Sequence, residues 1–129
     1  MKIMKAFVAS RVSGEERESL IAFLREVDRA LRAAGIEPYI TELSASQPDD
    51  GQKLQRAFRH IDESEVLVVI YKPGLPSEGM SAEVGYAYGR KPVWIFAQEG
   101  SASSLFALAD KVVYWSDETV LMHDLEDAV

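Results

Sequence analysis

The stretch EVLVVIY at residues 65–71 decides the fold of this sequence. After its leading glutamate it contains only Val, Leu, Ile and a final Tyr. An uninterrupted apolar run of this kind is typical of a strand that is covered on both faces of a sheet. It therefore predicts the central strand of a mostly parallel sheet with helices on either side.

Segments with strand and helix patterns alternate on both sides of this run. The clearest helix is 15–34, in which apolar side chains recur at intervals of three or four residues. Ser13 followed by Glu16 predicts a capping box at its start, and Gly35 predicts its end. The strands predicted in this way are 4–10, 36–43, 65–71, 92–97 and 111–115.

Three further helices and one short helix complete the pattern. The first follows a polar loop in which Asp49 or Asp50 predicts the cap, and carries Leu54, Phe58 and Ile61 on one stripe. The others are predicted at 79–89, around 103–109, and at 118–129. The alternation predicts an α/β fold, a flavodoxin-like or Rossmann-like three-layer sandwich with five strands in the order 2-1-3-4-5.

This fold places a ligand crevice outside the carboxyl ends of the strands, where the strand order reverses between strands 1 and 3. The loops that begin at Ser10, Tyr71 and Ala97 are then expected to line the crevice. A chain of 129 residues has room for one domain, so we expect residues 1–129 to form a single unit.

The composition limits which partners and cofactors we expect for this protein. With 14 basic and 21 acidic residues the net charge is 14 − 21 = −7, which disfavours nucleic acid and anionic membranes as partners. The sequence has no cysteine and no apolar run near the ~20 residues that span a bilayer, so we expect a cytoplasmic protein. His60 and His123 lie far apart without a metal-binding motif, and the sequence implies neither a metal nor another cofactor.

The stretch SEGMSAEVGYAYGRKPV at residues 77–93 places Glu83 among small residues. In a helix over 79–89, Ala82, Gly85 and Gly89 share one stripe, which predicts close packing of that stripe on the sheet. Glu83 lies about 100° from the stripe and is expected to face the crevice. A helix amino terminus favours an ionised carboxylate and lowers its pKa. Such a group suits glycosyl transfer, in which the anomeric carbon becomes oxocarbenium-like; the alternative is a solvated first-turn carboxylate.

Three segments carry a resemblance to a known family. They are 77–93, KAFVASRVSGEE at 5–16, and HIDESEVLVVI at 60–70. In order and spacing they resemble the nucleoside 2-deoxyribosyltransferase superfamily, including its deoxynucleoside monophosphate N-glycosidase branch, over roughly residues 4–114. The E-x-G-Y-A segment at 83–87 is the most specific element of the likeness.

The resemblance implies roles for several residues. It makes Glu83 the nucleophile that takes the deoxyribosyl group, and Ser77, six positions earlier, a contact for the sugar or phosphate. The backbone N–H groups of Gly79 and Met80 would suit a 5′-phosphate. Ser77 can equally be an ordinary helix cap.

Four weaker candidates complete the predicted site. Ser10 and Arg11, after strand 1, are candidates for a phosphate or base, although Arg11 can equally be a solvated loop charge. Tyr86 is a candidate for stacking on a nucleobase. Ser104 resembles the phosphate-binding serine that the N-glycosidase branch supplies from a neighbouring subunit, so the resemblance also implies a homodimer or a higher homo-oligomer.

Two positions depart from the family. Phe7 stands in the substrate-binding region where the family has a tyrosine, and Ala57 stands where it has a catalytic aspartate. The hydroxyl and the acid that assist the nucleophile and the leaving base are therefore missing. Three hypotheses stay open: cleavage or transfer at the glycosidic bond of a small nucleoside or nucleotide, a non-catalytic nucleotide-binding sensor, and an NAD-cleaving enzyme of the Toll/interleukin-receptor-like kind.

Overall fold

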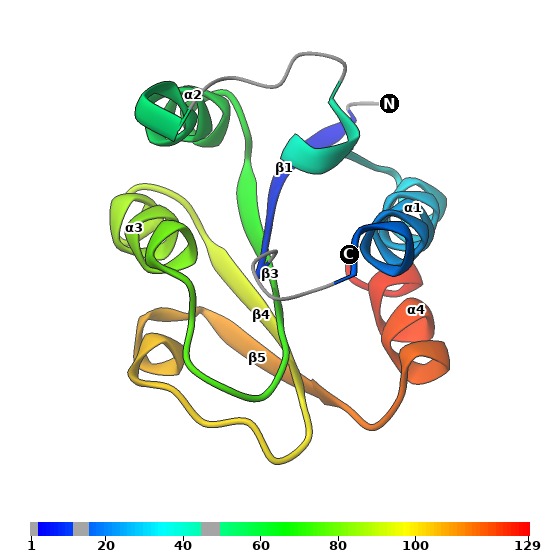
Figure 1. Ribbon diagram of the computed structural model, residues 1–129. Helices are drawn as coiled ribbons and strands as arrows, with labels where there is room; N and C mark the ends of the chain where they lie inside the picture. Colours follow the sequence, from blue (N-terminus) through cyan, green and yellow to red (C-terminus); the bar gives the residue numbers. More distant parts are fainter. Residues whose placement is uncertain (1–2, 12–15, 45–49) are drawn as a thin grey trace.

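A computed structural model of the chain describes residues 3–11, 16–44 and 50–129. Five strands alternate with four α-helices and two short 3₁₀ helices (Figure 1). In chain order the elements are β1 (Met4–Ser10), α1 (Arg17–Ala33), β2 (Ile36–Tyr39), η1 (Thr41–Leu43), α2 (Asp50–Asp62), β3 (Val66–Tyr71), α3 (Glu78–Ala87), β4 (Val93–Gln98), η2 (Ser104–Leu108), β5 (Lys111–Trp115) and α4 (Glu118–Glu126).

The strands form one sheet in the order β2-β1-β3-β4-β5, and every neighbouring pair is parallel. Helices α1 and α4 lie on one face of the sheet and α2 and α3 on the other (Figure 1). The predicted fold class and strand order are therefore confirmed. Among the described residues, no helix is long and apolar enough to cross a membrane.

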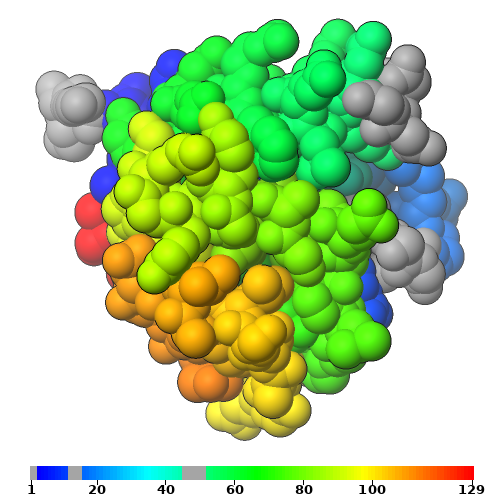
Figure 2. All heavy atoms as spheres, turned by 90° about the vertical axis from the view of Figure 1, so that its left-hand side faces the viewer, coloured from blue at the N-terminus to red at the C-terminus, as the bar shows by residue number. Residues whose placement is uncertain are grey.

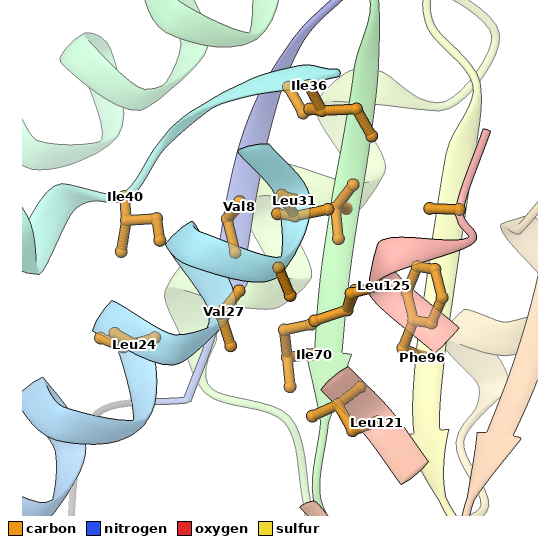
Figure 3. Packing of buried hydrophobic residues seen from close by; sticks show 14 of the residues in the cluster. Val8, Leu24, Val27, Leu31, Ile36, Ile40, Ile70, Phe96, Leu121 and Leu125 are labelled. Atoms are coloured by element: carbon orange, nitrogen blue, oxygen red, sulfur yellow. The ribbon is translucent and has the colours of Figure 1, made fainter. Parts of the chain in front are cut away.

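Strand β3 is buried along its whole length because both of its faces are covered. Alternate side chains of β3, at Val66, Val68 and Ile70, belong to the core under α1 and α4, part of which Figure 3 shows. The intervening side chains, at Leu67, Val69 and Tyr71, belong to the core under α2 and α3. The continuous apolar run at 65–71 is thus the sequence signature of a strand with two buried faces.

The start of α1 and the end of β2 differ from the predictions. The Glu16 carboxylate accepts hydrogen bonds from the N–H groups of Glu18 and Ser19, so Glu16 is itself the N-cap of α1. Ser13 lies outside the described residues. The strand predicted at 36–43 ends at Tyr39, because residues 41–43 turn into η1. Gly35 has φ +83 and follows α1 as predicted.

The inward face of α3 also differs from the prediction. Met80, Val84 and Ala87 are buried against the sheet, whereas Gly85 is exposed and Gly89 lies beyond the end of the helix. No atom outside its neighbourhood in the helix lies within 4 Å of a Cβ placed on Gly85. Larger apolar side chains at helical spacing bury more surface than a stripe of small ones, so they determine which face packs inward.

Candidate active site

A cavity of about 390 Å³ lies where β1 ends and α3 begins. This is the predicted position, between the carboxyl ends of strands 1 and 3. Its walls come from β1, η1, α2 and the start of α3. The lining residues are Ser10, Thr41, Glu42, Lys53, Leu54, Ser77, Glu78, Gly79, Met80 and Glu83. Figure 2 views the molecule from the side on which α2 and α3 lie.

Five of the predicted site residues meet in this cavity: Ser10, Ser77, Gly79, Met80 and Glu83. The sequence analysis did not predict the opposite wall, which η1 and α2 supply. Glu42 was included in a predicted strand, and only the turn of residues 41–43 into η1 brings its side chain to the cavity. A polar residue just after the second strand, at the carboxyl edge of the sheet, is the signal that would have identified it.

Ser77 caps the helix that forms the floor of this site. Its Oγ accepts a hydrogen bond of 3.1 Å from the Met80 N–H, which confirms the predicted cap. This bond occupies the Met80 N–H, so the prediction that it binds a phosphate is wrong. The first N–H groups of an α-helix have no intrahelical acceptor, so those of Gly79, as predicted, and of Glu78 are available to an anion in the cavity.

Glu83 is partly buried, and its carboxyl has an unusual protonation state. Burial, together with the negative charge of Glu42, raises the pKa of Glu83 to about 8. The prediction of an ionised carboxylate with a lowered pKa is therefore wrong for the unliganded protein. Glu83 is the sixth residue of α3, beyond the first turn in which the helix dipole acts, so desolvation and the like charge determine its pKa.

Glu42 faces a different balance of charges in the same cavity. Burial raises its pKa, while the positive charges of Lys53 and Arg17 and a hydrogen bond from its own backbone N–H oppose the increase. Two carboxyl groups with perturbed pKa values thus line one cavity. Perturbed carboxyl pairs of this kind are typical of acid–base sites.

The end of β1 leaves two polar atoms without partners. The Ser10 Oγ and the Arg11 Nε are buried, and neither has a hydrogen-bond partner in the part of the chain that the structure describes. The Arg11 Nη1 donates a bond of 3.4 Å to the Leu75 carbonyl oxygen and lies 2.9 Å from where a Cβ on Gly74 would be. Arg11 therefore lies against the loop between β3 and α3 and is not one of the cavity-lining residues.

Three predicted site residues lie elsewhere. Phe7 is buried in the core under α2 and α3, where its ring stacks on Tyr39. Tyr86 faces away from the cavity: its hydroxyl donates to the Asp62 carboxylate at 2.8 Å, and its ring stacks on Phe58. Ser104 is exposed at the start of η2 and does not line the cavity.

The region of the missing acid is apolar. Ala57 is buried in the same core as Phe7, so neither position offers a hydroxyl or a carboxyl. Asp62, at the end of α2, is engaged by Tyr86 and does not line the cavity. Within the described ranges, no three His, Asp or Glu side chains come together in a way that would hold a metal ion.

The structure was compared with solved structures. A CMP N-glycosidase of Clostridium botulinum superposes with a TM-score of 0.72 at 15% identity, covering 97% of this chain and 99% of that one. A 2-deoxyribosyltransferase of Leishmania mexicana gives 0.70 at 16% identity, covering 98% and 99%. A 2-deoxyribosyltransferase of Bacillus psychrosaccharolyticus gives 0.64 at 20% identity, covering 95% and 90%.

The chain has the 2-deoxyribosyltransferase fold. At the level of fold, the resemblance stated from the sequence is therefore confirmed. Comparison of the sequence with protein-family models found no match, and comparison with curated proteins found none either. The 2-deoxyribosyltransferase fold thus comes here with a strongly diverged sequence.

Proposed function

We propose that this protein cleaves, or transfers the sugar across, the N-glycosidic bond of a small nucleoside or nucleotide, with Glu83 as the nucleophile. The observation that carries the proposal is the Glu83 carboxyl in a cavity at the carboxyl edge of the sheet, beside the amino terminus of α3. The fold shared with an N-glycosidase and with 2-deoxyribosyltransferases supports it.

The cavity is suited to a sugar phosphate in size and in polar groups. A volume of about 390 Å³ is within the range of small-molecule sites. In this proposal the free N–H groups at the start of α3 bind a 5′-phosphate, and Ser77 and Ser10 contact the sugar or phosphate. The buried, unpartnered Ser10 Oγ supports a polar ligand there, because such atoms are normally satisfied.

The proposed reaction begins with attack on the sugar. An oxygen of the ionised Glu83 carboxylate forms a bond to C1′ while the C1′–N bond breaks, and the bonding electrons leave with the base. Water, or a second base in a transfer reaction, then displaces Glu83 from C1′. Because the pKa of Glu83 is about 8 without ligand, it must lose its proton before it attacks.

Base release measures this function directly. The purified protein is incubated with a panel of ribonucleosides, 2′-deoxyribonucleosides, their 5′-monophosphates and NAD, and the free base is quantified by chromatography. We expect release from at least one nucleoside or nucleotide, and a loss of at least ~10³-fold in Glu83→Gln, because the nucleophile is removed.

A matched variant controls for the loss of one carboxyl. Glu63→Gln changes an exposed glutamate that does not line the cavity, and we expect it to retain wild-type activity. No release from any member of the panel, or equal release by wild type and Glu83→Gln, would overturn the proposal. Release of nicotinamide from NAD alone would identify the NAD-cleaving alternative.

A non-catalytic nucleotide-binding module is the second candidate, and one observation favours it. Ala57 and Phe7, at the family positions of the acid and the tyrosine, are both buried in an apolar core. A protein that kept the cavity and lost the chemistry would bind nucleotides without turnover. Titration calorimetry with the same panel separates the candidates: saturable binding without base release supports the module, and turnover excludes it.

The proposal includes a homodimer, since the resemblance assigns Ser104 to a neighbouring subunit's site. The exposed position of Ser104, outside the cavity of its own chain, is compatible with that role. Light scattering during size-exclusion chromatography measures the mass against the 14.4 kDa of one chain.

A further inference from the structure

A second carboxyl group lines the same cavity as the proposed nucleophile and belongs to a different element. Glu42 belongs to η1, just after β2, while Glu83 belongs to α3. Both side chains are partly buried, and both line the cavity. Because both carboxyls line one poorly solvated cavity, the negative charge of Glu42 also contributes to the raised pKa of Glu83.

The other charged groups around Glu42 come from three elements. Lys53 from α2 lines the same cavity, and Arg17 at the start of α1 adds a second positive charge. Glu78 and Glu83 contribute negative charge from α3. The positive charges near Glu42 thus come from α1 and α2, and the carboxyl of Glu83 comes from α3. Two ionised carboxylates repel each other, and a proton on either one removes that repulsion.

The chemistry of the proposed function creates a need that these residues meet. A base that leaves with the bonding electrons must take up a proton, and general acid assistance is worth ~10²–10⁴ in rate. The usual position of that acid is Ala57, a buried methyl group. Among the described residues that line the cavity, the carboxyl groups are those of Glu42, Glu78 and Glu83. Glu83 is needed as the nucleophile, and Glu78 is exposed at the first position of α3.

We propose that Glu42 is the catalytic acid and base of this site: it protonates the departing base and then deprotonates the attacking water. Glu42 would thus take the role of the aspartate that the resembling family has at the position of Ala57. The inference rests on the proposed function. It assigns to a residue of the opposite wall a role that the diverged α2 no longer fills.

In this proposal the two carboxyls share one proton. Burial and the Glu42 charge keep the proton on Glu83 at neutral pH. Transfer of that proton from Glu83 to Glu42 ionises the nucleophile and protonates the acid in a single step. The pair then holds the proton where the leaving base needs it, as two carboxyls that cannot both ionise commonly do.

Each step balances. The Glu83 carboxylate forms the C1′–O bond, the C1′–N bond breaks, and the base nitrogen takes the electron pair and the Glu42 proton. Water then attacks C1′, its proton goes to the Glu42 carboxylate, and the C1′–O bond to Glu83 breaks to restore the Glu83 carboxylate. Glu42 ends protonated, as it was before the base left.

The test compares two leaving groups that differ in their need for a proton. Guanine must be protonated to leave, whereas a base methylated at N7 already carries a positive charge and leaves neutral. 2′-Deoxyguanosine 5′-monophosphate and its N7-methyl derivative are the paired substrates, with the best natural substrate of the panel and its activated analogue used instead if guanine is not accepted. With enzyme in excess over substrate, so that only the first, base-releasing step is followed, we expect Glu42→Gln to lower the rate of base release from the unmethylated substrate by ~10²-fold or more. The rate of release from the methylated substrate is expected to change by less than about threefold.

The controls separate this role from a structural one. Glu83→Gln is expected to abolish release from both substrates, and Glu63→Gln to change neither. Glu42→Asp keeps a carboxyl and is expected to restore part of the rate on the unmethylated substrate. Equal losses on both substrates in Glu42→Gln, or no loss on either, would overturn the inference while leaving the proposed function intact. A wild-type protein that releases no base overturns both.

A second measurement does not depend on turnover. Carbon-13 NMR titration of the glutamate side-chain carboxyls follows Glu83 in wild type and in Glu42→Gln. We expect the pKa of Glu83 to fall from about 8 when the Glu42 charge is removed, and to stay above its ordinary value of 4.5 because burial remains. An unchanged Glu83 titration in a folded Glu42→Gln protein would show that the two groups do not share a proton.

Discussion

At the scale of the residue, Glu83 shows how burial of a carboxyl in a cavity conflicts with stability. Its carboxyl is held in a partly buried cavity with a second carboxyl and without an ion-pair partner among the described residues. Pattern alone predicted that Glu83 faces the crevice, and the cavity lining agrees. Its protonation was predicted wrongly, because the burial that raises its pKa is a tertiary feature. The second cause, the charge of Glu42, reaches the cavity only through the turn into η1.

The raised pKa of Glu83 predicts a dependence of stability on pH. In the unfolded chain the pKa is near 4.5, and in the folded protein it is about 8. Between these values the folded state binds more protons than the unfolded chain. The contribution of Glu83 to the free energy of unfolding is therefore highest below about pH 4.5 and is progressively lost as the pH rises to about 8. Since one pKa unit corresponds to about 1.4 kcal/mol, the loss is on the order of a few kcal/mol.

Glu83→Gln removes this titration. Urea unfolding between about pH 5 and about pH 9 is expected to show a much flatter stability profile for Glu83→Gln, which becomes more stable than wild type at the alkaline end. A small slope of the same sign remains, because burial also raises the pKa of Glu42. The exposed Glu63→Gln keeps the wild-type slope. Parallel profiles for wild type and Glu83→Gln would show that Glu83 is ionised in the folded protein.

At the scale of the element, α3 shows which features of a helix local sequence determines. Its existence and its start were predictable within one residue, since Ser77 is a strong cap and its Oγ accepts the Met80 N–H. The buried face was not predictable from the glycines. Both Gly85 and Gly89 fit a close-packing stripe by spacing, yet the side chains of Met80, Val84 and Ala87 fill the interface with the sheet.

Two glycine substitutions test this assignment with opposite expected signs. Gly85 is exposed within the helix and has open space at its Cβ position, so Gly85→Ala is expected to stabilise the protein by about 0.5–1 kcal/mol. Gly89 has φ +80 just after the helix, so Gly89→Ala is expected to destabilise it by about 1–2 kcal/mol. Urea unfolding with a shared slope measures both. Destabilisation by Gly85→Ala would mean that this face of α3 is packed.

At the scale of the whole molecule, the sequence predicted the architecture and one side of the site. The fully apolar run 65–71 and the alternation of periods determine a parallel sheet, and the topology then places the crevice at the β1 and β3 ends. Ser10, Ser77 and Glu83 meet there as predicted. The wall formed by Glu42 and Lys53 was not predicted, because its position depends on how η1 and α2 approach the sheet. Tyr86 was misplaced because its bond to Asp62 is a tertiary contact.

The core under α2 and α3 predicts that position 57 does not accept the aspartate that 2-deoxyribosyltransferases were expected to have there. Ala57 is 4% exposed, so the carboxylate of Ala57→Asp would lie among apolar side chains. An unpaired buried charge costs about 3 kcal/mol or more, and the loss grows with pH as the new carboxyl ionises. Gln55→Asp, on the exposed face of the same helix, is the matched control and is expected to change the unfolding free energy by less than about 0.5 kcal/mol.

If Ala57→Asp folds with wild-type stability and speeds base release from the unmethylated substrate in the Glu42→Gln background, α2 still has room for an acid at this position. A destabilised Ala57→Asp protein without that gain would instead show that packing has taken over this position, and that the proton for the leaving base has to come from another wall of the cavity.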